Sequence, residues 1–124
     1  MNYRMLGSTG LLVSEIGFGT IPILQGNIPV LPDYFNLDEK EALAVMNYAY
    51  KQGCNLYDTA IVPEYGDAEI KLGKFAASIG RKHIIISDKA RFFSGSEMYQ
   101  AVETSCENLG TIPGLYFVHQ VDAD

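Results

Sequence analysis

The sequence is poor in cysteine and in long apolar runs, and each shortage argues against a class of protein. Its two cysteines, Cys54 and Cys106, lie far apart, with no CxxC pair and no histidine at ligand spacing. This pattern is typical of buried thiols that act as small apolar side chains, and it argues against a disulfide framework or a metal site. No run approaches about 18 apolar residues, so the sequence predicts no transmembrane helix.

Positive charge is also scarce. Nine lysines and arginines stand against 15 aspartates and glutamates, which gives a formal net charge of -6. An acidic chain argues against nucleic acid or an anionic membrane surface as a partner. Residues 1–10 contain no apolar core of a signal peptide, so a reducing, cytoplasmic location is expected.

The chain has 124 residues, 48% of them hydrophobic and 19% charged, which is ordinary for one globular domain with a core of its own. Turn signals and hydrophobic periodicity predict an N-terminal β-hairpin followed by alternating strands and helices. The hairpin covers residues 3–13. Buried strands are expected at 16–19, 55–57, 84–86 and 115–118, helices at 38–52, 67–79 and 94–109, and a long loop at 20–37.

Local signals support the helix limits. Asp38 can cap the first helix, Gly53 can stop it, and Ser94 and Glu97 have the spacing of a capping box. Apolar stripes are expected along the helices: Ala42, Val45, Met46 and Ala49; Leu72, Phe75, Ala76 and Ile79; and Met98, Ala101, Val102, Ser105, Cys106 and Leu109. The alternation predicts an α/β fold with parallel strands and right-handed crossovers.

Polar residues follow three of the expected strands: Asp58, then Tyr65 in the loop beyond it, Lys89 and His119. Parallel strands would bring these four residues to one rim of the sheet. An ammonium beside a phenol stabilises the phenolate, a carboxylate can fix the ammonium, and an imidazole can orient a carbonyl oxygen. Such a set could polarise a carbonyl group and protonate it as hydride arrives.

Five stretches together resemble the aldo-keto reductase family across essentially the whole chain. They are YRMLGSTGLLVSEIGFGT, NLYDTA, YGDAEIKLG, IIISDK and LYFVHQVD. The resemblance implies a TIM-type (β/α)8 barrel, of which residues 1–124 would form the N-terminal half, with the hairpin closing the bottom. It also implies reduction of small aldehydes and ketones with NADPH.

Carried over by position, Tyr65 would be the general acid of this family. Lys89 would lower the pKa of Tyr65, and Asp58 would form an ion pair with Lys89 and fix its position. His119 would orient the substrate. Gly19, Thr20 and Asp58 would lie near the nicotinamide end of the cofactor.

The chain departs from the family pattern at two sites. DTAIVPEYG has two more residues than the family's D-T-A-x-x-Y-G, one of them Pro63, before Tyr65. Asp88 stands where the family often has threonine. Because adjacent strand residues point to opposite faces, Asp88 is expected to point away from Lys89.

The predicted order stops after four strands, whereas a full barrel takes roughly 250 residues. If these residues were the complete polypeptide, little or no turnover would be expected, because half of the cofactor site would be missing. One alternative is therefore a half-barrel that acts only with a second copy or with a C-terminal half covering its open edges. A regulatory relative of the family and a small doubly wound α/β domain are further alternatives. Sequential strand order would favour the barrel, and a reversal would favour the doubly wound sheet.

Overall fold

The computed structural model describes residues 1–25, 36–91 and 94–120. An antiparallel hairpin of β1 (Tyr3–Met5) and β2 (Leu12–Ser14) precedes a parallel sheet of β3 (Phe18–Gly19), β4 (Leu56–Asp58), β5 (Ile85–Ala90) and β6 (Leu115–Val118). The strand order β3-β4-β5-β6 is sequential. The predicted alternation and the barrel-type order are therefore confirmed, and the doubly wound sheet is wrong.

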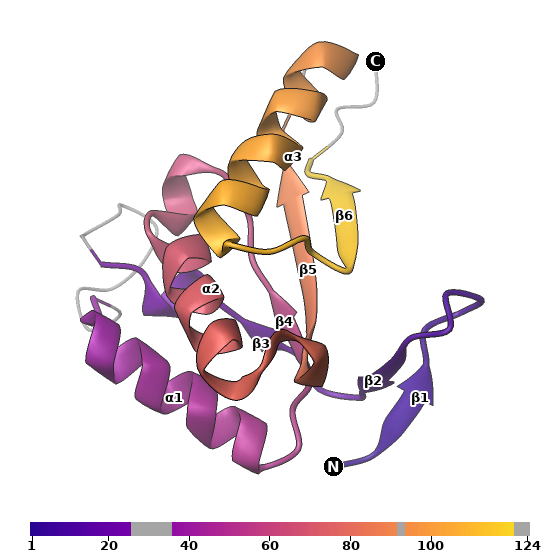
Figure 1. Ribbon diagram of the computed structural model, residues 1–124, viewed down its shortest axis with the longest axis vertical. Coiled ribbons are helices and arrows are strands. Elements are labelled where there is room, and N and C mark those ends of the chain that lie inside the picture. Colours follow the sequence, from indigo (N-terminus) through magenta and orange to yellow (C-terminus); the bar gives the residue numbers. More distant parts are fainter. Residues whose placement is uncertain (26–35, 92–93, 121–124) are drawn as a thin grey trace.

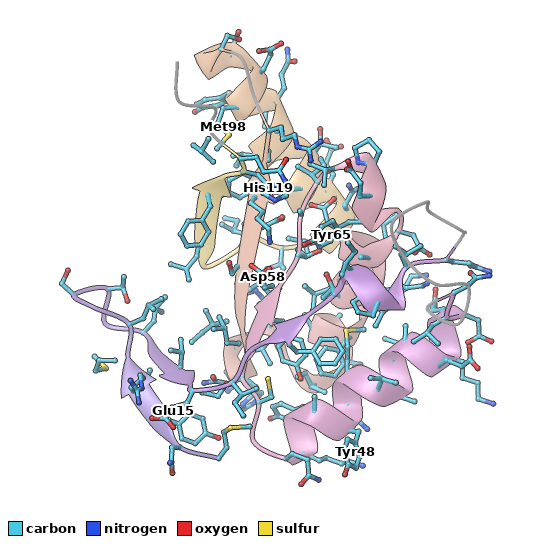
Figure 2. All side chains as sticks on the ribbon, turned by 180° about the vertical axis from the view of Figure 1, so that it is seen from behind. Glu15, Tyr48, Asp58, Tyr65, Met98 and His119 are labelled. Carbon is cyan, nitrogen blue, oxygen red and sulfur yellow. The ribbon has the colours of Figure 1, made fainter. Side chains whose placement is uncertain are left out.

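Three α-helices cover one face of this sheet: α1 (Glu39–Lys51), α2 (Ala68–Ile79) and α3 (Gly95–Leu109). Figure 1 shows them in front of the strands, while Figure 2, turned by 180°, shows the opposite face of the sheet. Helices on a single face are the arrangement of a barrel wall, in which the other face is turned inward.

The helix limits follow the predicted signals. The Asp38 carboxylate accepts a hydrogen bond from the Glu41 amide, and the Glu41 side chain accepts one from the Asp38 amide. Ser94 accepts a hydrogen bond from the Glu97 amide at the start of α3, and Gly110 takes a left-handed conformation at its end. Reciprocal caps of this kind satisfy backbone N–H groups that the first turn leaves unpaired.

The core lies between the sheet and the helices. Its centre is the fully buried Tyr57, whose ring centroid is 5.2 Å from that of Phe75 on α2 and 5.5 Å from that of Phe18 on β3. The Tyr57 hydroxyl donates a hydrogen bond of 2.9 Å to the carbonyl of Met46 on α1. One side chain therefore ties β4 to both neighbouring helices.

Replacing Tyr57 by phenylalanine is expected to lower the free energy of unfolding by about 1 kcal/mol, because the buried hydrogen bond to Met46 is lost while the ring packing stays. Denaturant unfolding would measure the change. The matched control is Tyr48→Phe on α1, where the side chain is exposed and the same chemical change should cost almost nothing. Equal stability of the two variants would contradict this role for the hydroxyl.

The hairpin lies at the amino end of the sheet. Asn55, just before β4, accepts a hydrogen bond of 2.7 Å from the Ser14 amide and donates one of 2.9 Å to the Leu12 carbonyl. The hairpin therefore stands at the end opposite to the polar strand ends, as the family resemblance implies.

The burial predicted for two strands is wrong, because these strands lie at the edges of the sheet. β3 has two residues, of which Phe18 is half-buried and Gly19 exposed, and β6 ends in the exposed Phe117 and Val118. Both strands have a neighbour on one side only, so neither is the buried strand that its apolar run predicted. Val45 is exposed on α1 as well.

Two further elements differ from the prediction in extent or burial. β5 continues to Ala90, because residues 87–90 pair with β6. In α3, Ser105 and Leu109 are buried, but Met98, Ala101, Val102 and Cys106 are only half-buried. The amino-terminal turns of α3 extend past the end of the sheet (Figure 1), so within the described residues the strands do not cover them. The middle of the predicted long loop, with Gly26, Pro29 and Pro32, lies outside the described residues.

Candidate functional site

The strand register places polar side chains on the sheet face that the helices leave open. Asp58 is paired with Gly19 on one side and with Ser87 on the other, and Lys89 is paired with Phe117. Paired residues in parallel strands point to the same face, and residues two apart along one strand do so as well. Gly19, Asp58, Ser87 and Lys89 therefore share one face near the carboxyl ends of the strands.

Asp58 and Lys89 form an ion pair, with 2.5 Å between Oδ2 and Nζ. The Lys89 ammonium also donates a hydrogen bond of 2.8 Å to the Thr59 carbonyl, and Ser87 donates one of 2.9 Å to Asp58 Oδ1. The lysine side chain is 15% exposed, whereas the aspartate is 43% exposed. The ammonium is thus held in place beside a carboxylate that still reaches solvent.

Tyr65 lies next to this ion pair and belongs to a short 3-10 helix, η3 (Pro63–Tyr65). The Lys89 ammonium lies 5.4 Å from the centroid of the Tyr65 ring, within the range of a cation–π contact. The Tyr65 amide bonds to the Val62 carbonyl at 2.9 Å, and the ring packs partly buried against the core. The two additional residues of this loop are therefore accommodated in η3, and Tyr65 still contacts Lys89.

His119 follows β6 and is anchored by its amide, which donates a hydrogen bond of 2.8 Å to the Ala90 carbonyl. Burial and the positive charges of Lys89 and Arg91 lower its pKa, against the opposing effects of Asp58 and Glu64. The lowered pKa favours the neutral form of the imidazole near pH 7. Its Nδ1 is buried, and no hydrogen-bond partner for it lies in the described part of the chain. Figure 2 shows Asp58, Tyr65 and His119 gathered in one region.

The expected cofactor residues differ in exposure. Gly19 is exposed, and a Cβ atom built on it would meet no atom of the described residues within 4 Å. Open space therefore lies beside Asp58. Thr20 is fully buried; its amide donates a hydrogen bond of 2.9 Å to the Asp58 carbonyl, and its hydroxyl has no partner among the described residues.

Sequence reasoning missed Ser87, Glu64 and Arg91. Ser87 stands two residues before Lys89, so strand alternation alone could have placed it on the same face. Arg91 pairs with Glu64 at 3.2 Å, and both act on the His119 pKa. Hydrogen bonds from the backbone and the charge of Arg91 lower the pKa of Glu64. No sequence signal joins these two residues, which are 27 positions apart.

A cavity of about 420 Å³ lies elsewhere, between α2 and α3 on the helix side of the sheet. Small and apolar residues form most of its walls, and the charged side chains that line it in the described chain are Lys74, Arg81 and Glu107. This cavity does not contain the polar strand ends. Within the described residues, no helix is long and apolar enough to cross a membrane, and no cluster of three potential metal ligands is present.

Known proteins similar to this chain belong to one enzyme family. The family model of the aldo/keto reductases matches residues 15–124. The chain belongs to the aldo/keto reductase family. Aldo-keto reductase AMT2 of Alternaria alternata is 37% identical over 91 residues, which cover 70% of this chain and 23% of AMT2.

Solved structures of aldo/keto reductases share the fold. PA4992 of Pseudomonas aeruginosa is 34% identical, with a TM-score of 0.80 over 95% of this chain and 47% of that protein. An aldo/keto reductase of Klebsiella pneumoniae, solved with NADP and acetate, is 21% identical, with a TM-score of 0.72 over 89% of this chain and 36% of that one. The chain thus spans less than half of these relatives, and it has the fold of part of an aldo/keto reductase TIM barrel.

Proposed function

We propose that residues 1–124 form the N-terminal half of an NADPH-dependent carbonyl reductase and supply its proton-transfer residues. The observation that carries this proposal is the Lys89 ammonium, which Asp58 holds at 2.5 Å and which lies against the ring of Tyr65. Family membership and the fold support the reaction class. A cytoplasmic location and a small aldehyde or ketone as substrate belong to the same proposal.

Four residues at the carboxyl ends of the strands, here called the rim, have separate tasks in this scheme: Asp58, Tyr65, Lys89 and His119. Tyr65 donates its phenolic proton to the carbonyl oxygen as the carbonyl carbon is reduced. Lys89 stabilises the phenolate that remains, and Asp58 keeps the ammonium in position. The neutral His119 can hydrogen-bond the substrate oxygen and orient it without competing as a cation.

The residues present fit the nicotinamide end of NADPH. Gly19 leaves open space beside Asp58, and the amide of Thr20 fixes the backbone there. NADPH supplies hydride when bound, and the NADP complex of the Klebsiella pneumoniae relative supports this choice of cofactor. Near the carboxyl ends of the strands, the cations Lys89 and Arg91 are both paired with carboxylates. The groups that bind the adenosine phosphate of NADPH are therefore expected from the other half of a barrel.

Titration with NADPH tests the cofactor proposal. The chain contains no tryptophan and eight tyrosines, so quenching of tyrosine fluorescence reports binding. Saturable quenching is expected, with NADPH bound more tightly than NADH. Gly19→Val should weaken binding by about tenfold or more, which corresponds to about 1.4 kcal/mol, because the valine side chain would fill the space that opens at Gly19 among the described residues.

The fold of the Gly19→Val protein provides the control. Valine suits a strand, and no atom in the described part of the chain lies within 4 Å of the new Cβ atom, so the unfolding midpoint should stay unchanged. Equal NADPH affinity of the two proteins would show that Gly19 does not border the cofactor. Absence of binding in both would favour a half-barrel that acts only when a partner covers β3 and β6.

A further inference from the structure

Two carboxyl groups are buried together behind the rim, on the helix side of the sheet. Glu69, in the first turn of α2, is 4% exposed, and Asp88, in β5, is fully buried. Asp88 points to the face opposite that of Lys89, as strand alternation predicts. Buried carboxylates are normally paired with a cation. Among the described residues, neither of these two forms an ion pair.

Each carboxyl group has one bonded oxygen and one that lacks a donor. Asp88 Oδ1 accepts a hydrogen bond of 2.8 Å from the Lys89 amide, and Glu69 Oε2 accepts one of 2.8 Å from the Asn108 side chain. The other oxygens, Asp88 Oδ2 and Glu69 Oε1, are buried, and no donor among the described residues meets the geometry of a hydrogen bond with them, since the nearby Ser105 hydroxyl is bonded to Tyr116. A single proton between the two groups would satisfy both oxygens.

The surroundings favour retention of that proton. Burial, followed by the charge of Glu69, raises the pKa of Asp88 to about 7, although the Lys89 amide and the Ser105 hydroxyl act in the opposite direction. Burial also raises the pKa of Tyr116 to about 12, so this phenol stays neutral. Among the described residues, Ser105 of α3 also acts on Asp88, and Tyr116 of β6, which is bonded to Ser105, is influenced by both carboxyl groups and by Cys106.

We propose that Glu69 and Asp88 share one proton near neutral pH, and that this proton is a pH-sensitive latch between α2 and β5. The latch connects β5, which carries Lys89, to α2, which follows the short helix of Tyr65. Tyr65 lies just before α2, four residues from Glu69, and Asp88 directly precedes Lys89. When the proton leaves, two adjacent carboxylates repel each other across the α2–β5 contact. The latch exists independently of the proposed reductase activity; only its consequence for the Tyr65–Lys89 contact rests on that function.

The latch gives the protein a stability that declines with rising pH. The folded-state pKa of Asp88 lies above the value near 3.9 that an aspartate has in an unfolded chain. Between these two values the folded state binds more protons than the unfolded state. The free energy of unfolding therefore falls as the pH rises through this window, and this contribution is fully lost above a pH of about 7.

Thermal unfolding of the protein between pH 5 and pH 8.5 tests the latch with Asp88→Asn. The asparagine amide can donate permanently to Glu69, while its carbonyl oxygen still accepts from the Lys89 amide. We expect the melting temperature of the wild type to fall by about 5 °C more than that of Asp88→Asn across this range. Glu103→Gln, which removes an exposed carboxylate from α3, should keep the wild-type decline. The same decline in Asp88→Asn as in the wild type would overturn the proposal.

Infrared spectroscopy provides a readout that needs no variant. The wild type at pH 6 should show the C=O stretch of a protonated carboxyl group, and this band should vanish with a midpoint near pH 7. Glu69→Gln should remove the pH-dependent band. Absence of the band from the wild type at pH 6 would show that both groups are ionised, and it would overturn the shared proton. Neither measurement uses carbonyl reduction, so failure of the latch and failure of the proposed function are distinguishable.

Discussion

Replacing Tyr65 by phenylalanine is expected to slow carbonyl reduction by about 10²- to 10⁴-fold, because the substrate oxygen loses its proton donor. The substitution should leave the fold intact. The Lys89 ammonium contacts the face of the ring at 5.4 Å, and a phenyl ring offers the same face. The part of the ring that packs against the core is also retained. The loss should therefore appear in kcat, with little change in NADPH affinity.

The assay follows the oxidation of NADPH with a panel of aldehydes and ketones. It uses the protein itself, or residues 1–124 joined to the C-terminal half of PA4992 where the chain alone shows no turnover. Tyr99→Phe is the matched control, because this tyrosine is 74% exposed on α3 and makes the same chemical change outside the proposed set of rim residues. If Tyr65→Phe and Tyr99→Phe both kept the full rate of carbonyl reduction, the proton would come from another group. His119 would then be the first residue to replace.

The helices were predictable because their signals are local. The cap formed by Asp38 and Glu41, the stop at Gly53 and the cap at Ser94 lie within a few residues of the helix ends that they define. The exposure of β3 and β6 was not predictable in the same way. Apolar strand sequences such as LYFV indicate burial, but burial depends on the strand next to them, which the segment itself does not specify.

The rim was predictable only in part. Strand ends placed Asp58 and Lys89 correctly near each other, because parallel strands end at one edge. The contact of Tyr65 with Lys89 depends on the path of η3, which no residue spacing specifies. The arrangement around Asp88 was equally hidden, since its neighbours come from α2, α3 and β6. Whether the rim residues act in catalysis stays a prediction.

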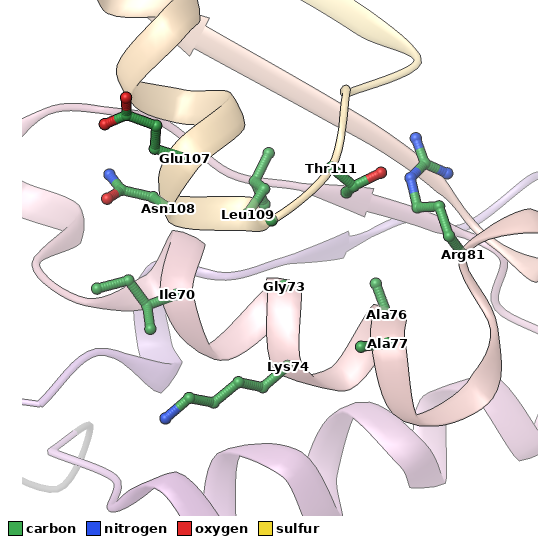
Figure 3. A pocket seen from close by; sticks show the side chains of 11 residues that line it. Ile70, Gly73, Lys74, Ala76, Ala77, Arg81, Glu107, Asn108, Leu109 and Thr111 are labelled. Carbon is green, nitrogen blue, oxygen red and sulfur yellow. The ribbon is translucent and has the colours of Figure 1, made fainter.

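Gly73→Ala is expected to be the most damaging of the glycine substitutions to stability, with a loss of about 3 kcal/mol in the free energy of unfolding. In most helices this change stabilises by up to about 1 kcal/mol, because glycine is a poor helix former. At Gly73, however, a Cβ atom would lie 2.3 Å from the carbonyl oxygen of Leu109. Figure 3 shows Gly73 of α2 directly facing the end of α3 that carries Leu109.

The clash cannot be relieved by a side-chain rotation, because the three nearest atoms all belong to the backbone of Leu109. α2 and α3 would have to separate, and Asn108, one residue away, would move from Glu69. Gly95→Ala is the matched control, since no atom of the residues that the structure describes lies within 4 Å of its Cβ position at the start of α3. Denaturant unfolding of the two variants gives the comparison. Equal stability would mean that α2 and α3 do not pack this closely, and the support that Asn108 gives to the Glu69–Asp88 pair would then be in question.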